Sequence, residues 1–265
     1  MTPNSLWFPH LTPNDSDRLR LFCFPYAGGG TLAFRSWLDY FPSAIRIYPV
    51  ELPGRCFRLQ EPAIAQLQPL VREIARALYP YLDKPFAFFG HSMGALIGFE
   101  LTRLLRKQHQ ISPIRLCVSG RCAPQIPPFE SPIYHLPSSE FLTALRRLNG
   151  TPSEFFENLE LMELALPILR ADFAVVETYS YLREEPLSCP ISVFGGLQDP
   201  KTTVNFLKAW QAQSTQDISL HLFSGDHFFI HSDRNEFLKL LVRDLQQSIF
   251  ESSIQNKNIR QLKLT

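Results

Sequence analysis

Short apolar runs of strand length alternate with segments of helical periodicity along most of this 265-residue chain. One run, at 85–89, is almost wholly apolar, as expected of a central strand that is buried on both faces. Such alternation favours an α/β fold with a mostly parallel sheet and helices on both faces. The runs predicted to be strands are 19–25, 45–52, 85–89, 114–119, 191–194 and 218–223.

Three segments between or after these runs have apolar residues at helical spacing, at 64–82, 95–107 and about 233–250. Pro69 is expected in the first turn of its helix, where a missing N–H is tolerated. No linker or internal repeat divides the chain, so 1–265 is predicted to be one domain. The polar residues 251–265 are expected to form a flexible tail.

The alternation breaks between 121 and 190, where no strand is apparent. Helical stretches are expected there at 138–148, 152–159 and 161–181. Seventy residues are too many for a plain connection between two strands. We interpret 121–190 as a helical lid over the carboxyl edge of the sheet, the edge where such folds bind ligands. A helical layer without a gating role is the alternative.

The composition excludes several classes of function. A formal net charge of +1 gives no support for binding to nucleic acid or to a membrane surface. The five cysteines are an odd number, widely spaced and without metal-ligand spacing, which indicates buried thiols in a reducing compartment. The N-terminus lacks the pattern of a secretory signal and no apolar run could span a bilayer. We therefore expect a cytoplasmic protein, with a monomer as the default state.

The motif with the clearest chemistry is Gly-x-Ser-x-Gly at 90–94, between a buried strand and a helix. A serine on a sharp strand-to-helix turn is crowded by its neighbours, so Gly90 and Gly94 suit the positions that flank it. Ser92 would then lie at a helix N-terminus, where the free N–H of Met93 and the helix dipole favour negative charge. This context predicts that Ser92 is a nucleophile.

A serine hydroxyl needs a base, and the base needs an acid that fixes its tautomer. His227 follows the last predicted strand, and Asp199 follows the strand before it. Both would lie at the carboxyl edge with Ser92, in the chain order Ser–Asp–His of α/β-hydrolases. We therefore predict a triad of Ser92, Asp199 and His227.

Other residues compete for these roles. Asp226 adjoins His227 and is an alternative acid, although neighbouring side chains diverge. His91 is interpreted as packing support within the turn rather than as a base. His231 could lie near the site, but we interpret it as the solvated start of a helix.

The glycine-rich segment 24–30 ends the first predicted strand. It lacks the spacing of a phosphate or dinucleotide loop, which argues against nucleotide binding. In a hydrolase this loop can supply a backbone N–H to an oxyanion hole, opposite that of Met93. Ala27 is the first candidate for this donor and Tyr26 the second.

Together these motifs resemble the stand-alone type II thioesterases of nonribosomal peptide and polyketide synthases. The resemblance covers nearly the whole chain, and the segment around Asp172 is its most family-specific part. Cys56 and Asn149 depart from residues that are often glycine in the family. The matching segments are 24–30, 51–55 with Arg58, 90–94, 149–152, 169–173, 195–199 and 225–229.

The resemblance implies an α/β-hydrolase that cleaves acyl groups from the phosphopantetheine thiol of acyl or peptidyl carrier protein domains. It implies no metal and no cofactor, since the phosphopantetheine belongs to the carrier. Four alternatives stay open: a medium-chain fatty acyl-carrier or acyl-CoA hydrolase, a general carboxylesterase or lipase, an acyltransferase or cyclase, and a non-catalytic carrier-binding module. Arg55 and Arg58 either meet a carrier's acidic surface or phosphate, or are surface or loop-fixing arginines.

Overall fold

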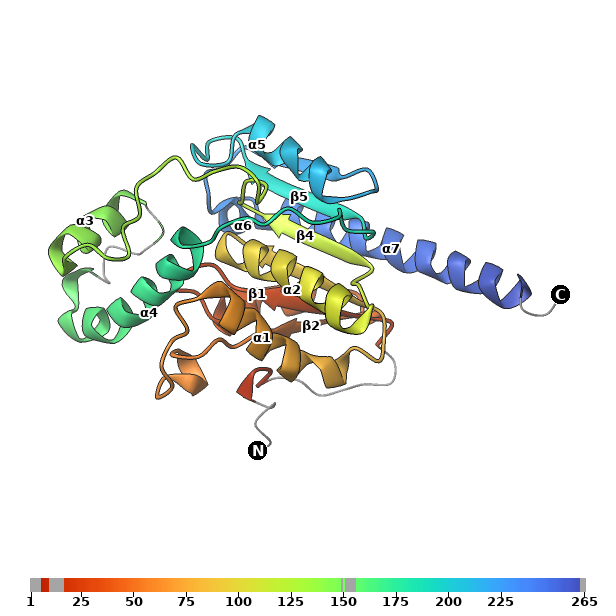
Figure 1. The fold of residues 1–265 in the computed structure, drawn as a ribbon, viewed down its shortest axis with the longest axis horizontal. Helices are drawn as coiled ribbons and strands as arrows, with labels where there is room; N and C mark the ends of the chain where they lie inside the picture. The colour runs from red at the N-terminus through yellow and green to blue at the C-terminus, as the bar shows by residue number, and fades with distance from the viewer. Residues whose placement is uncertain (1–5, 10–16, 149, 151–155, 263–265) are drawn as a thin grey trace.

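A computed structural model describes residues 6–9, 17–148, 150 and 156–262. Six parallel strands form one sheet in the order β2-β1-β3-β4-β5-β6, with helices on both faces (Figure 1). The fold class and all six strands predicted from the sequence are confirmed. The strands are β1 Leu19–Phe24, β2 Ile45–Pro49, β3 Phe86–His91, β4 Arg115–Ser119, β5 Ile191–Gly196 and β6 Ser219–Phe223.

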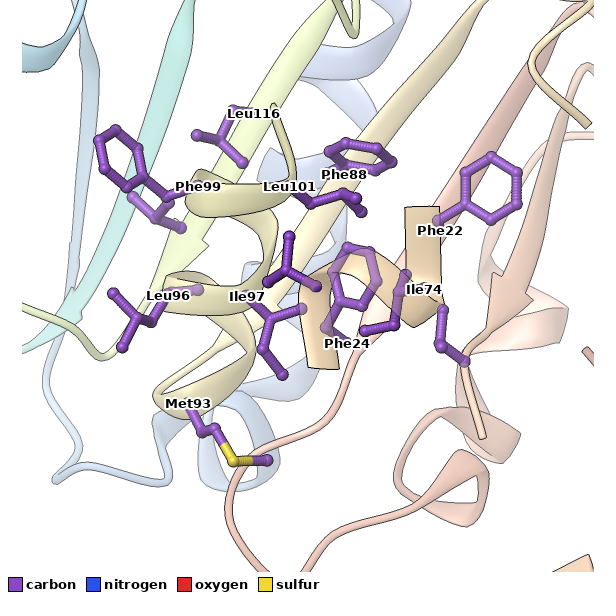
Figure 2. Close-up of a cluster of buried hydrophobic side chains, with 14 of the residues drawn as sticks. Phe22, Phe24, Ile74, Phe88, Met93, Leu96, Ile97, Phe99, Leu101 and Leu116 are labelled. Atoms are coloured by element: carbon purple, nitrogen blue, oxygen red, sulfur yellow. The ribbon is translucent and has the colours of Figure 1, made fainter. Parts of the chain in front are cut away.

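Alternate side chains of β1 enter two different cores, because successive residues of a strand point to opposite faces. Phe22 and Phe24 pack in one core with the amphipathic helices α1 (Leu67–Leu78) and α2 (Met93–His109), as Figure 2 shows. Leu19, Leu21 and Cys23 pack in the other core. Burial on both faces explains why β1 reads as a nearly continuous apolar run.

The second core is covered by the C-terminal helix α7 (Arg234–Leu262) and by a 3₁₀ segment, η2 (Thr31–Tyr40). The sequence predicted that the last helix ends near Phe250, followed by a polar tail. That boundary was wrong, since α7 continues to Leu262 and projects from the body of the molecule (Figure 1). Apolar periodicity does not mark this extension, because residues 251–262 are mostly polar.

The segment between β4 and β5 is helical, as predicted, with α3 (Ser138–Arg147) and α4 (Leu159–Glu177). The predicted helix at 152–159 and the motif at 149–152 fall largely outside the described residues. Asn158 caps α4 by accepting a hydrogen bond from the Leu161 N–H at 3.1 Å. Figure 1 places α3 and α4 beyond one end of the sheet. The described residues also include the short helices α5 (Val204–Lys208) and α6 (Phe229–Ser232), and 3₁₀ segments at Cys56–Arg58, Tyr79–Tyr81 and Ala209–Gln213.

The strand order reverses between β1 and β3, because the chain runs outward from β1 to β2 and then returns to the other side of β1. In open parallel sheets this switch point leaves a crevice at the carboxyl ends of the two strands. The glycine-rich loop after β1 and the Ser92 turn after β3 flank that crevice. Among the described residues, no helix is long and apolar enough to cross a membrane.

Candidate active site

Ser92 lies on a strained turn between β3 and α2, with φ 54° and ψ −110°. A Cβ atom on Gly90 would come within 2.0 Å of the Gly94 carbonyl oxygen. A Cβ atom on Gly94 would come within 2.1 Å of the Phe24 carbonyl oxygen. Only glycine fits these two positions, as the motif predicted. The Ser92 N–H donates to the Ser119 carbonyl at 2.7 Å, which holds the turn against the end of β4.

The side chain of His91, the residue before Ser92, is fully buried beneath this turn. Its Nδ1 atom lies 2.9 Å from the Ser119 hydroxyl, and its ring packs edge-on against Tyr26. Burial, together with the charges that His227 and His231 carry when protonated, lowers the pKa of His91 well below 6.5. A buried neutral ring with these partners fits the packing role expected from the sequence.

Asp199 and His227 form a hydrogen-bonded pair at the carboxyl ends of β5 and β6. The Asp199 Oδ2 atom lies 2.6 Å from Nδ1 of His227. Asp199 is buried and accepts two further hydrogen bonds at 2.9 Å, from the Lys201 N–H and the Thr202 hydroxyl. The loops also bond directly, because the Gln198 N–H donates to the Gly225 carbonyl at 3.1 Å.

These hydrogen bonds decide the charge of Asp199. Burial alone would raise its pKa, but the hydrogen bond and charge of His227, with the donors at Lys201 and Thr202, lower the pKa below 3.8. The carboxylate is therefore ionised at neutral pH, and it fixes the tautomer in which Nδ1 of His227 carries the proton. The other ring nitrogen, Nε2, is then free to act as a base.

The His227 ring lies beside the serine turn, with its centroid 4.9 Å from that of His91. The His227 side chain is 24% exposed, so a substrate and water can reach it. In the described part of the chain, the Ser92 hydroxyl makes no hydrogen bond. The structure thus joins the imidazole and the acid directly, and brings the serine to the same edge of the sheet.

The rival residues have other partners. Asp226 is exposed, and its Oδ1 atom accepts from the Phe228 N–H at 2.8 Å, which closes its own loop. His231 is exposed on α6, and its Nε2 atom lies 3.3 Å from the Tyr26 hydroxyl. Neither side chain contacts the Asp199–His227 pair through a described hydrogen bond.

Two backbone N–H groups beside the serine turn are free to bind an anion. Within the described residues, neither the Ala27 nor the Met93 N–H has an acceptor. The loops that carry them touch, because Gly94 packs against the carbonyl oxygens of Phe24 and Pro25. The Met93 N–H lies in the first turn of α2, where the helix dipole also favours negative charge.

Arg55 and Arg58 are each only 6% exposed, so of the two interpretations of these residues the loop-fixing one holds. Arg58 forms a forked ion pair with Glu61, at 2.8 and 2.5 Å. Arg55 instead reaches Asp172 on α4, a contact that no sequence spacing indicated. Among the described residues, no group of three or more His, Cys, Asp or Glu side chains is placed to share a metal ion.

Comparison with known proteins finds one family model, close relatives and a solved structure that each match most of the chain. The family model described as "Thioesterase domain" matches residues 19–246. Linear gramicidin dehydrogenase LgrE of Brevibacillus parabrevis is 48% identical over 229 residues, 85% of this chain and 87% of that protein. Gramicidin S biosynthesis protein GrsT of Aneurinibacillus migulanus is 43% identical over 240 residues, 91% and 94% of the two chains. The structure of BorB, a type II thioesterase from the borrelidin biosynthetic cluster, matches with a TM-score of 0.82 and 30% identity, covering 92% of this chain and 98% of BorB.

Proposed function

The chain belongs to the thioesterase-domain family, among the type II thioesterases of nonribosomal peptide and polyketide pathways, and we propose that it hydrolyses acyl groups from the phosphopantetheine thiol of carrier proteins. The catalytic groups are Ser92, His227 and Asp199. The observation that carries this proposal is the 2.6 Å bond between Asp199 and Nδ1 of His227, on a ring that lies beside the Ser92 turn.

In the first step His227 Nε2 takes the proton of Ser92 as the Ser92 oxygen attacks the thioester carbonyl carbon. The negative charge that develops on the carbonyl oxygen is bound by the N–H groups of Met93 and Ala27. The carbon–sulfur bond then breaks, and the proton held by His227 goes to the departing sulfur. The products of this step are the free carrier thiol and an acyl-serine.

In the second step His227 removes a proton from water as the water oxygen attacks the acyl-serine carbonyl. Collapse of this second tetrahedral intermediate returns the proton to Ser92 and releases the carboxylic acid. The ionised Asp199 stabilises the imidazolium in both steps. The reaction needs no cofactor from this chain, because the phosphopantetheine arm belongs to the carrier.

The biological role that follows is the clearing of stalled or wrongly primed synthase modules. Acyl and peptidyl carrier domains are the expected partners. The gating role of 121–190, the monomeric state and the cytoplasmic location stay predictions.

A substrate panel tests the proposal. The same acetyl, butyryl and octanoyl groups are presented on a carrier protein, on coenzyme A and as oxygen esters, with free acid measured by mass spectrometry. We expect kcat/KM to be highest on the carrier, and Ser92→Ala to be inactive on all substrates. Preference for coenzyme A or for oxygen esters would replace the carrier proposal with one of the alternatives. Transfer of the acyl group to an acceptor other than water would indicate an acyltransferase.

A further inference from the structure

The structure links helix α4 to the loop after β1 through one ion pair. The Arg55 guanidinium donates from Nη1 to Oδ2 of Asp172 and from Nη2 to Oδ1, both at 2.8 Å. Oδ2 also accepts from the Gly28 N–H at 2.8 Å, and Nη1 also donates to the Gly29 carbonyl at 2.9 Å. We propose that Arg55 and Asp172 are positioning residues that hold the Ala27 N–H in the geometry that binds the oxyanion, a role that rests on the proposed function.

Three hydrogen bonds orient the peptide units of the loop at residues 26–30. A peptide unit is planar, so a hydrogen bond to its carbonyl or from its N–H fixes the direction of both groups. The Gly29 N–H donates to the Tyr26 carbonyl at 2.9 Å, which sets the plane that contains the Ala27 N–H. Asp172 fixes the peptide unit between Ala27 and Gly28 by accepting from the Gly28 N–H. Arg55 fixes the peptide unit between Gly29 and Gly30 by donating to the Gly29 carbonyl.

Of these three hydrogen bonds, the one from Gly29 to Tyr26 lies within the loop itself and closes a single turn. The other two come from Arg55 and Asp172, 117 residues apart in sequence and both almost completely buried. Gly28 has a φ of 76°, which glycine adopts easily because it has no Cβ atom. The same lack of a side chain leaves the backbone at Gly28 free to rotate. The buried pair therefore supplies the rigidity that a glycine-rich loop lacks.

Asp172 lies on helix α4, so the ion pair connects the loop to a different part of the molecule. Helix α4 belongs to the segment interpreted as a lid, and its C-terminal half is buried around Asp172 and Val175. Its N-terminal half is largely exposed, with Leu159 and Leu164 among the exposed residues. The pair thus couples the position of α4, which packs against α2, to the geometry of the oxyanion loop.

Asp172→Asn tests this role, because asparagine keeps the shape but offers one acceptor oxygen in place of the two that receive three hydrogen bonds. The key readout compares two ligands of equal acyl length. A trifluoromethyl ketone forms a tetrahedral oxyanion on the serine, whereas a methylene thioether has no carbonyl. We expect kcat to fall about 10- to 100-fold, less than the 10²–10³ typical of losing an oxyanion donor outright. Ketone affinity should fall by the same factor and thioether affinity by less than twofold.

Glu61→Gln is the matched control, because it weakens the ion pair of another buried arginine, Arg58, with the partly exposed Glu61, and this pair makes no described contact with residues 26–30. Its kcat and ketone affinity should stay within twofold of the unsubstituted protein. If Asp172→Asn does not fold, Arg55→Lys takes its place, since it keeps both charges but removes the forked geometry. The same selective loss of ketone affinity is expected.

A folded Asp172→Asn or Arg55→Lys protein with unchanged kcat and ketone affinity would overturn the positioning role. Equal losses of ketone and thioether affinity would also overturn it, because they indicate a general disturbance of the binding site. Failure of the proposed thioesterase function would give a different result. In that case the unsubstituted protein itself neither hydrolyses acyl thioesters nor binds the ketone.

Discussion

Asp199 Oδ2 lies 2.6 Å from Nδ1 of His227, although 28 residues separate them in the chain. Parallel strands bring this about, because β5 and β6 are neighbours that end at the same edge of the sheet. Asp199 follows one strand and His227 the other, and the two loops bond to each other. The pairing of acid and base is therefore a direct consequence of sheet topology.

Asp199→Asn should reduce kcat by about 10⁴, since asparagine can stabilise the wrong imidazole tautomer and cannot balance the imidazolium charge. Steady-state hydrolysis of an acyl carrier measures the effect. Asp226→Asn is the matched control, because Asp226 is adjacent in sequence but exposed and bonded to its own loop. A larger loss in Asp226→Asn than in Asp199→Asn would reverse the assignment of the acid.

Gly28→Ala should impair catalysis more than folding. The φ of 76° disfavours alanine by about 1–2 kcal/mol. The added Cβ would also come within 2.7 Å of the Leu169 side chain on α4, so the loop or the helix must shift. We expect at least a tenfold lower kcat with a modest decrease in melting temperature.

Gly98→Ala is the control for this substitution. Its Cβ would lie 3.4 Å from the Leu116 side chain, an ordinary contact, and alanine favours the interior of α2. It should keep full activity and equal or higher stability. Unchanged kcat in Gly28→Ala would show that the shape of this loop does not matter for the reaction.

His91 should make the protein sensitive to mild acid. Its folded-state pKa lies well below 6.5, mainly through burial, whereas the unfolded chain takes up a proton near pH 6.5. Its contribution to stability is therefore complete above pH 6.5 and is lost as the pH falls toward the folded pKa. In His91→Asn, which keeps a polar group near Ser119, the free energy of unfolding should change less between pH 7.5 and 5.5.

Urea unfolding at both pH values measures this difference. Comparison with the unsubstituted protein cancels the contribution of the other titratable groups. An equal loss of stability in both proteins would show that His91 is not the group responsible.

The central strands could be predicted from sequence because burial on both faces leaves an uninterrupted apolar run, as at Phe86–Phe89. Chain order on those strands then indicated which loops carry Ser92, Asp199 and His227. Helix ends were predicted less well where packing does not mark them, as for α7 beyond Phe250. The 3₁₀ segment Thr31–Tyr40, whose buried residues Thr31, Phe34 and Trp37 are three positions apart, was not predicted.

The Arg55–Asp172 pair could not be predicted. Its residues are 117 positions apart, in a loop and in a helix of the inserted segment. No periodicity links such positions, since their contact depends on where the inserted segment places α4. The family-specific character of the segment around Asp172 was the only sequence signal, and it gave no partner.

Ser92 should carry the acyl group during turnover. Rapid mixing with an octanoyl carrier, an acid quench and peptide mass spectrometry should find an octanoyl adduct on Ser92. Ser92→Ala should form no adduct and hydrolyse the thioester at least about 10³-fold more slowly, with an unchanged melting temperature. An adduct on another residue, or near-normal hydrolysis by Ser92→Ala, would contradict the account.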